Sequence, residues 1–249
     1  MPTRMRKLNF GAGPATLPES VLNEFAKDLI DFEGSGIGIG ELSHRTEMFE
    51  NGVLAVANEN IAKLTGYGGK EWQVLWMTGG GTGQFAAVPM NFDFKSGAKA
   101  VYLVTGCWSE KAAEEAKKLV GLEAVVVIDL RTKKGNFSSL RDPKEWIEEV
   151  KRIEEEINYV YYCDNETVDG IELPESNYFQ DLLTDTIIGS SAVFVADTSS
   201  NFLSRDLPRA EGRIGLVFAG VQKNLGAAGV TVVLIKKTVL ASKIKPRNW

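Results

Sequence analysis

Short apolar runs alternate with amphipathic segments along most of the chain. The runs lie at 72–77, 100–104, 124–128, 159–162, 193–197, 216–220 and 230–235, with helical patterns between them from about 83, at 109–119 and at 142–156. Short apolar runs separated by helices are typical of buried parallel strands. The pattern predicts an α/β fold with a mostly parallel sheet of the seven-stranded type, containing one antiparallel strand and covered by helices on both faces.

Two amphipathic segments precede the first run, at 16–32 and 46–65. In the first, Thr16 and Glu19 have the spacing of a capping box, and the apolar positions that follow share one helical face. In the second, the apolar positions are also spaced for a single stripe. Farther along, Asp142 precedes a proline and an amphipathic stretch, so we expect it to be the N-cap of the helix that begins there.

The connection between the last two runs is too short for a parallel crossover. Only nine residues, 221–229, separate Gly220 from Val230, whereas a crossover between parallel strands needs a dozen or more. If the two strands are neighbours, they pair antiparallel. Lys223 then lies in the turn that joins them.

Composition and charge are those of an ordinary globular protein. The chain has 249 residues, 44% hydrophobic and 24% charged, which suits one large domain or one domain plus part of another. Its 28 basic and 33 acidic residues give a net charge of −5, which argues against nucleic acid and anionic membranes as partners. No run approaches the roughly 20 apolar residues of a membrane span.

The start of the chain lacks the apolar stretch of a secretory signal, and Cys107 and Cys163 have no CxxC spacing. We therefore expect a reduced protein of the cytoplasm. The single histidine, His44, excludes a histidine-rich zinc site, and we expect no bound metal.

The stretch LWMTGGGTGQFAA at 75–87 reads as strand, glycine-rich turn and helix start, where free backbone amides favour an anion. It lacks the Gly-Lys-Ser/Thr of a P-loop. It does match G-x-G-x-x-A through Gly81, Gly83 and Ala86, so a nucleotide-dependent oxidoreductase is one alternative. The acidic residue that such enzymes carry about 20 positions later is missing, and a purely structural turn is the other alternative.

Three further residues give the glycine loop a chemical context. Asp197 ends an apolar run, where ligands of open α/β sheets gather, although it could simply cap the next turn. Lys223 has apolar flanks, and a shielded amine is a nucleophile for a carbonyl, whereas most lysines only reach solvent. Trp108 follows another strand and could stack on a ring or belong to the core. An anion site, a carboxylate and an amine are the contacts that pyridoxal 5′-phosphate requires.

Seven ordered motifs identify a family. They are NFGAGPATLPESVL, GELSHRT, GGGTGQFAAVPMN, TGCWSEKAAEEAKK, YVYYCDNETVDGIE, ADTSSNFLSR and VFAGVQKNLGAAGVTVV. Together they resemble the phosphoserine aminotransferase family, class V of the fold-type I pyridoxal-phosphate enzymes, over essentially the whole chain. The resemblance implies an aminotransferase of serine biosynthesis. Its reaction would interconvert O-phospho-L-serine plus 2-oxoglutarate and 3-phosphooxypyruvate plus L-glutamate.

The resemblance also implies roles for individual residues. Lys223 would form the Schiff base with the cofactor and act as the base, Asp197 would meet the pyridine nitrogen and Trp108 would stack on the ring. The rest of the cofactor site would comprise Gly81, Thr82, Thr167 and Gln222. His44 and Arg45 would bind the distal anion of the substrate across the interface of a homodimer; a solvated loop with a local salt bridge is the alternative.

Two departures from the family pattern matter. Thr82 stands where some relatives carry an arginine in the glycine loop, which removes one anion contact. The family continues past a point like Trp249 into a smaller domain, so we expect residues 1–249 to be the cofactor-binding large domain with its N-terminal segment. We expect such a chain to hold pyridoxal phosphate weakly and to turn over poorly or not at all; the alternative is a shortened isoform or fragment that keeps only the fold and the dimer surface.

Overall fold

The computed structural model describes residues 6–94, 97–133, 136–175, 177–208 and 212–244. Its centre is a seven-stranded sheet in the order β1 (Trp72–Thr78), β11 (Val230–Lys236), β10 (Ile214–Gly220), β9 (Val193–Asp197), β6 (Ile157–Cys163), β2 (Lys99–Val104) and β3 (Val125–Asp129). The pairs from β10 to β3 are parallel, and β11 is antiparallel to both of its neighbours. The predicted fold class and the antiparallel β10–β11 connection are confirmed.

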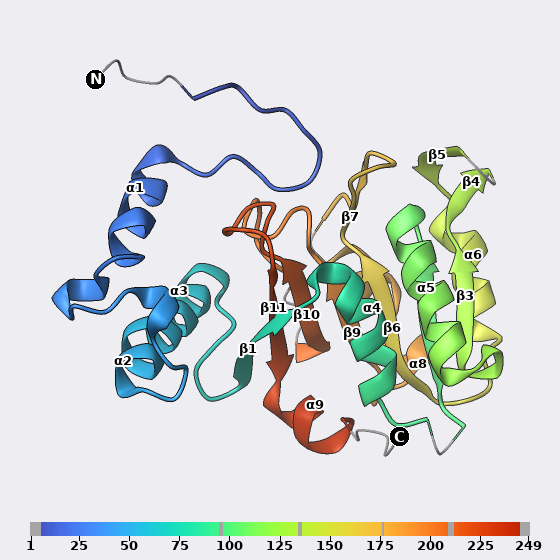
Figure 1. Ribbon diagram of the computed structural model, residues 1–249. Coiled ribbons are helices and arrows are strands. Elements are labelled where there is room, and N and C mark those ends of the chain that lie inside the picture. The colour runs from blue at the N-terminus through green and yellow to red at the C-terminus, as the bar shows by residue number, and fades with distance from the viewer. Residues whose placement is uncertain (1–5, 95–96, 134–135, 176, 209–211, 245–249) are drawn as a thin grey trace.

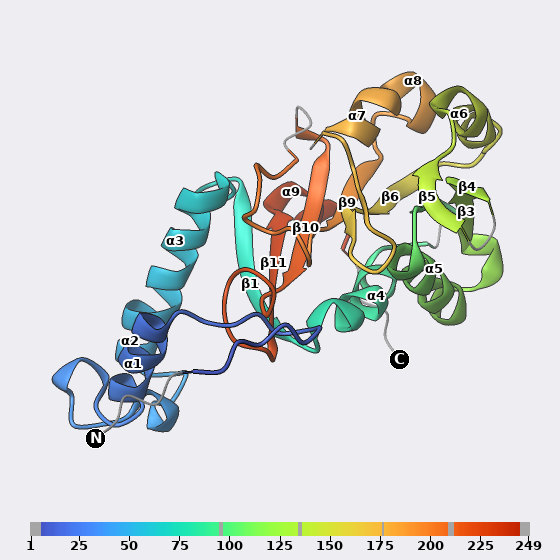
Figure 2. The same ribbon diagram turned by 90° about the horizontal axis from the view of Figure 1, so that it is seen from above.

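Helices cover both faces of the sheet (Figures 1 and 2). One face packs against α4 (Gly80–Asn91) and α5 (Cys107–Val120), and the other against α6 (Pro143–Lys151), α7 (Tyr178–Leu182) and α8 (Asp185–Ile188). Successive residues of a strand point to opposite faces, so β2 sends Tyr102 to the first core and Leu103 to the second. Because both faces are covered, all seven residues of β6 and of β10 are buried.

The N-terminal helices lie beyond the β1 edge of the sheet (Figures 1 and 2). Helix α1 spans Glu19–Asp28, follows Pro18 without a side-chain cap and buries none of its residues. The capping box predicted at Thr16 is therefore wrong, as is a helix over the whole of 16–32. The physical reason is Pro18, because a residue that precedes proline disfavours the helical conformation, which keeps Leu17 out of the helix.

The second N-terminal helix is interrupted by a π-helical segment. It comprises α2 (Glu47–Phe49), the π-helical η3 (Glu50–Ala55) and α3 (Val56–Thr65), and Thr46 caps its start by accepting from the amide of Phe49. The predicted helix is present, but its apolar positions do not form one buried stripe, and Leu64 is 65% exposed. A π-helical turn holds more residues than an α-helical one, so it rotates the face that follows.

Asp142 caps α6 as predicted, with its carboxylate accepting from the amide of Lys144 at 2.9 Å. The helix ends at Lys151 rather than 156, because β6 begins at Ile157 and the chain must turn before it. The elements that were not predicted are short. Two are hairpins, one of β4 (Arg131–Lys133) and β5 (Asn136–Leu140) and one of β7 (Asn165–Glu166) and β8 (Ile171–Glu172). The others are the helices α7, α8 and α9 (Lys237–Ser242). No helix in the described part of the chain has the length and apolar character needed to cross a membrane.

Candidate functional site

A cavity of about 430 Å³ lies at the carboxyl ends of β6 and β9, next to the β10–β11 turn. Ligands of open α/β sheets bind at this edge, and the volume is in the range of small-molecule sites. The structure brings all seven residues of the predicted cofactor site to its wall: Gly81, Thr82, Trp108, Thr167, Asp197, Gln222 and Lys223. They come from five separate stretches of the sequence, so their meeting is a result of the fold.

Asp197 is the last residue of β9 and only 4% exposed. One of its carboxylate oxygens accepts from the amide of Ser199 at 2.9 Å, and the other accepts from the hydroxyl of Tyr161 at 3.2 Å. No ion pair to this carboxylate occurs among the described residues. Burial raises the pKa of Asp197 to about 6, which is the behaviour of a buried carboxyl that lacks a cationic partner.

Lys223 lies in the turn between β10 and β11 and is half-buried. Backbone bonds from Leu225 and Gly226 to the carbonyl of Val221 close the turn, and the carbonyl of Gln222 accepts from the amide of Ala15 at 2.8 Å. The turn is thus tied to the N-terminal segment. Lys223 lines the cavity, and its amine forms no ion pair in the described part of the chain. The expected shielding by flanking strands is only partial, because the tip of a turn leaves one side open.

The glycine-rich turn directs the start of α4 at the cavity. Gly79 and Gly80 have φ values of 97° and 65°, which side chains rarely adopt, so glycine is required for the chain to enter the helix here. Gly81 is held close to β9 as well, since a Cβ there would lie 3.0 Å from the hydroxyl of Ser199. The first-turn amides of α4 have no intrahelical acceptor, so they are available to an anion at the cavity wall, where Gly81 and Thr82 lie.

Trp108 lies in the first turn of α5, and Thr167 lies in the loop between β7 and β8. The amide of Trp108 donates to the carboxylate of Glu166 at 2.9 Å, and the ammonium of Lys111 lies 4.5 Å from the centre of the indole ring. Trp108 lines the cavity, so its side chain is available to a ligand there.

Eight further residues line the cavity and were not predicted: Ala12, Gly13, Phe85, Cys163, Asn165, Val168, Ser199 and Ser200. Four of these eight, Asn165, Val168, Ser199 and Ser200, follow β6 or β9 in the sequence. Their position could have indicated a role at the site, since ligands of α/β sheets bind at the carboxyl ends of strands. Asn165 and Ser200 bond to each other, through Nδ2 to Oγ at 2.7 Å, which joins the two strand ends. Nothing in the local pattern of residues 12–13 indicated that the N-terminal segment reaches this site.

His44 and Arg45 do not line the cavity of their own chain. Both are exposed and lie just before α2, where the amide of Arg45 bonds only to the hydroxyl of Ser43 at 3.3 Å. The local salt bridge considered from the sequence is not formed by Arg45 within the residues described. A role for the pair in a partner's site stays a prediction.

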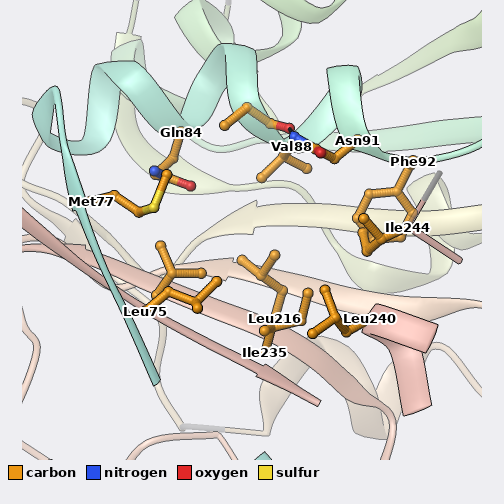
Figure 3. Close-up of a pocket in the computed structure, with 12 residues that line it drawn as sticks. Leu75, Met77, Gln84, Val88, Asn91, Phe92, Leu216, Ile235, Leu240 and Ile244 are labelled. Carbon is orange, nitrogen blue, oxygen red and sulfur yellow. Dashed lines mark hydrogen bonds between the residues drawn. The ribbon is translucent and has the colours of Figure 1, made fainter. Parts of the chain in front are cut away.

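A second hollow lies between α4, the sheet and α9, with a volume of about 170 Å³. Figure 3 shows Leu75, Leu216 and Ile235 of the sheet facing Val88 and Gln84 of the helix. Its lining contains amides but no acidic or basic side chain. It offers no group for acid, base or nucleophilic chemistry, so the candidate site is the first cavity.

Comparison with known proteins agrees with this choice. The family model described as aminotransferase class V matches residues 7–247. The chain is 40% identical to a putative phosphoserine aminotransferase of Schizosaccharomyces pombe, over 97% of this chain and 60% of that one. It is 37% identical to the phosphoserine aminotransferase of Drosophila melanogaster, over 96% of this chain and 59% of that one.

Among solved structures, the phosphoserine aminotransferase of Trichomonas vaginalis with bound pyridoxal phosphate superposes with a TM-score of 0.80 at 33% identity, covering 98% of this chain and 65% of that one. The enzyme of Bacillus circulans subsp. alkalophilus gives 0.77 at 34% identity, covering 94% and 58%. The chain thus spans about 60% of the length of the curated relatives it matches. The match over nearly all of its residues confirms the resemblance seen in the motifs: the chain belongs to the class-V aminotransferase family.

Proposed function

We propose that the chain binds pyridoxal 5′-phosphate and takes part in a transamination. The reaction interconverts O-phospho-L-serine plus 2-oxoglutarate and 3-phosphooxypyruvate plus L-glutamate. The observation that carries the proposal is the meeting of three groups at one cavity: the Lys223 amine, the buried Asp197 carboxylate and the amino end of α4. The names of the relatives at 36–40% identity support the reaction. Residues 1–249 are then the cofactor-binding large domain with its N-terminal segment.

The residues present fit the cofactor. The amides at the start of α4, with Gly81 and Thr82, suit a phosphate, because the positive end of a helix stabilises an anion. Asp197 is a buried carboxyl without a cationic partner in the described part, and a protonated ring nitrogen would supply one. Trp108, Thr167 and Gln222 complete the wall around the ring.

Bound pyridoxal phosphate supplies an aldehyde that amines attack and a protonated ring that withdraws electrons from the substrate's Cα. Lys223 would hold the cofactor covalently through Nζ. The same amine, when it is not bonded to the cofactor, would be the base that takes the proton from the substrate's Cα. Asp197 would accept a hydrogen bond from the ring nitrogen and so stabilise its protonated form, and Trp108 would pack against the ring.

The N-terminal helices support a homodimer. Four apolar side chains of α1 and the residues after it are about half exposed or more: Val21, Phe25, Leu29 and Ile30. A helix that buries nothing in its own chain but carries an apolar face is typical of an interaction surface. A second copy of the chain would cover it, and His44 and Arg45, which lie nearby in the sequence, would then bind the substrate's distal anion in the partner's cavity.

The free thiols of Cys107 and Cys163 agree with a reducing compartment, and we propose the cytoplasm. The oxidoreductase alternative has little support, because the glycine turn lacks its acidic partner and that reading gives Lys223 no role.

The test is covalent trapping. The wild-type chain is incubated with pyridoxal 5′-phosphate and reduced with borohydride, and the modified peptide is identified by mass spectrometry. We expect modification at Lys223, its loss in Lys223→Ala, and its retention in Lys237→Ala, a control lysine whose ammonium bonds the carbonyl of Gly69 far from the cavity. Modification spread over surface lysines, or unchanged in Lys223→Ala, contradicts the proposal.

A second measurement addresses the reaction. The chain loaded with cofactor is mixed with O-phospho-L-serine, L-glutamate or L-alanine, and the visible spectrum of the cofactor is followed. Conversion by phosphoserine and glutamate, but not by alanine, supports the proposed substrates. Because the chain spans about 60% of its relatives, binding without conversion would limit its function to holding the cofactor.

A further inference from the structure

Glu166 is a fully buried carboxylate that lies beside the cavity but does not line it. It belongs to the two-residue strand β7, where side chains alternate in direction. Its neighbours Asn165 and Thr167 face the cavity, so Glu166 points the other way, toward the start of α5.

The carboxylate of Glu166 binds the first turn of α5 with both oxygens. One oxygen accepts from the amide of Trp108 at 2.9 Å, and the other accepts from the amide of Ser109 at 2.9 Å and from its hydroxyl at 2.5 Å. The hydroxyl of Ser109 in turn accepts from the amides of Thr105 and Gly106. The whole turn from β2 into α5 is thus connected to one side chain that comes from 57 positions farther along the chain.

The backbone leaves room for this contact because residue 106 is glycine. A Cβ on Gly106 would lie 2.6 Å from two side-chain carbons of Glu166 and 2.4 Å from a carboxylate oxygen of Asp169. Asp169 accepts from the amide of Cys107 at 2.7 Å, so two carboxylates occupy three successive amides. A helix start satisfied in this way has no free amides for an anion, whereas the start of α4 has them.

We propose that Glu166 is a positioning residue of the candidate site, which fixes the Trp108 ring against the cavity by binding the backbone of α5 and leaves α4 as the anion site. The proposal rests on the proposed cofactor function. Trp108 carries its ring on the same residue whose amide Glu166 binds, so a shift of the turn moves the ring. The pKa of Asp197 is raised mainly by burial and additionally by the negative charge of Glu166. The Glu166 carboxylate therefore also acts electrostatically on the cavity that Asp197 lines.

The experiment compares the wild-type chain with Glu166→Gln, Glu166→Asp and Asp142→Ala. Glutamine keeps the size of the side chain but removes the charge and turns one acceptor into a donor that faces an amide. Asp142→Ala is the matched control, because it removes a carboxylate that caps α6, away from the cavity. Amide hydrogen exchange is measured without cofactor, and binding of pyridoxal 5′-phosphate is measured by its induced circular dichroism.

We expect Glu166→Gln to lose protection at the amides of Trp108 and Ser109 while the amides of α4 keep theirs. Its dissociation constant for pyridoxal phosphate should rise by up to roughly tenfold, because the displaced Trp108 ring loses its contact with the cofactor ring. The induced circular dichroism at saturation should also change, because the ring contact is displaced. Asp142→Ala should match the wild type at the amides of Trp108 and Ser109 and in cofactor binding, and Glu166→Asp should lie between the wild type and Glu166→Gln.

Two results for a folded Glu166→Gln variant would overturn the proposal. One is wild-type protection of the amides of Trp108 and Ser109. The other is wild-type affinity for pyridoxal phosphate together with a wild-type circular dichroism spectrum at saturation. If Glu166→Gln does not fold, the same measurements are made on Glu166→Asp, whose shorter side chain cannot reach both amides. A wild-type spectrum together with wild-type protection in Glu166→Asp would also overturn the proposal. A wild-type chain that binds no pyridoxal phosphate refutes the proposed function, and the exchange measurement still tests the contact with α5.

Discussion

Replacing Asp197 with asparagine should stabilise the chain when no cofactor is bound. The buried carboxylate accepts from the amide of Ser199 and the hydroxyl of Tyr161. Asparagine has the same shape, its oxygen can accept from Ser199, and its NH₂ group can donate to a hydroxyl that rotates to accept. The substitution therefore keeps the bond from Ser199, reverses the direction of the bond with Tyr161, and removes the cost of charging a buried group.

The magnitude follows from the pKa of Asp197. Burial raises it to about 6 in the folded chain from the ordinary value of 3.8, so folding favours the protonated form. Each pKa unit corresponds to about 1.4 kcal/mol, which makes the cost about 3 kcal/mol once the carboxyl is ionised. The wild-type chain has none of this cost below about pH 3.8 and acquires all of it as the pH rises through about 6. Asp197→Asn should be more stable by this amount at pH 7.5, and the difference should shrink as the pH falls below 6.

The assay is urea unfolding of the cofactor-free chain across this pH range, followed by tryptophan fluorescence, with Asp181→Asn as a control on an exposed carboxylate. The same variant should bind pyridoxal phosphate more weakly, since the ring nitrogen loses its carboxylate partner. Stability equal to or below that of the wild type at pH 7.5, or a gain that does not diminish toward pH 4, would mean that ionising Asp197 does not destabilise the folded chain.

Three other substitutions test the core, a close approach and the proposed interface. Trp146→Ala should lower the free energy of unfolding by about 3–5 kcal/mol in urea, because the side chain is 1% exposed and packs edge-on to Phe179; a loss below about 1 kcal/mol would be inconsistent with that packing. Gly106→Ala should cost about 1–3 kcal/mol through its clash with the two carboxylates, whereas Gly40→Ala meets nothing within 4 Å and serves as the control; equal melting temperatures would argue against the clash. Phe25→Asp should convert a dimer into monomers in sedimentation velocity, and an unchanged sedimentation coefficient would exclude α1 from the interface.

Much of the central sheet could be predicted because its strands are buried on both sides. Such strands are continuous apolar runs, so their positions follow from composition without knowledge of their neighbours. The cap at Asp142 and the antiparallel return after Gly220 are also local, since one depends on adjacent residues and the other on loop length. The short hairpins and helices α7 to α9 carried no comparable pattern, because two to six residues are too few to show a period.

The candidate site divides in the same way. The motifs around Gly81, Asp197 and Lys223 predicted a cofactor site, because each places a reactive or anion-binding group at a strand end or turn, and the structure brings all three to one cavity. Glu166 was not singled out, since its role depends on amides 57 and 58 positions earlier that reach it only through the packing of α5 on the sheet.

Local periodicity and spacing were enough to locate the strands and most helices and to name residue types that could hold a cofactor. Three features required the contacts of the folded chain: the six stretches that line the cavity meet, α5 is capped from a distant strand, and the apolar face of α1 stays uncovered within its own chain. The physical reason is that periodicity marks a surface as apolar or a residue as reactive, whereas what covers that surface or surrounds that residue depends on contacts between distant segments.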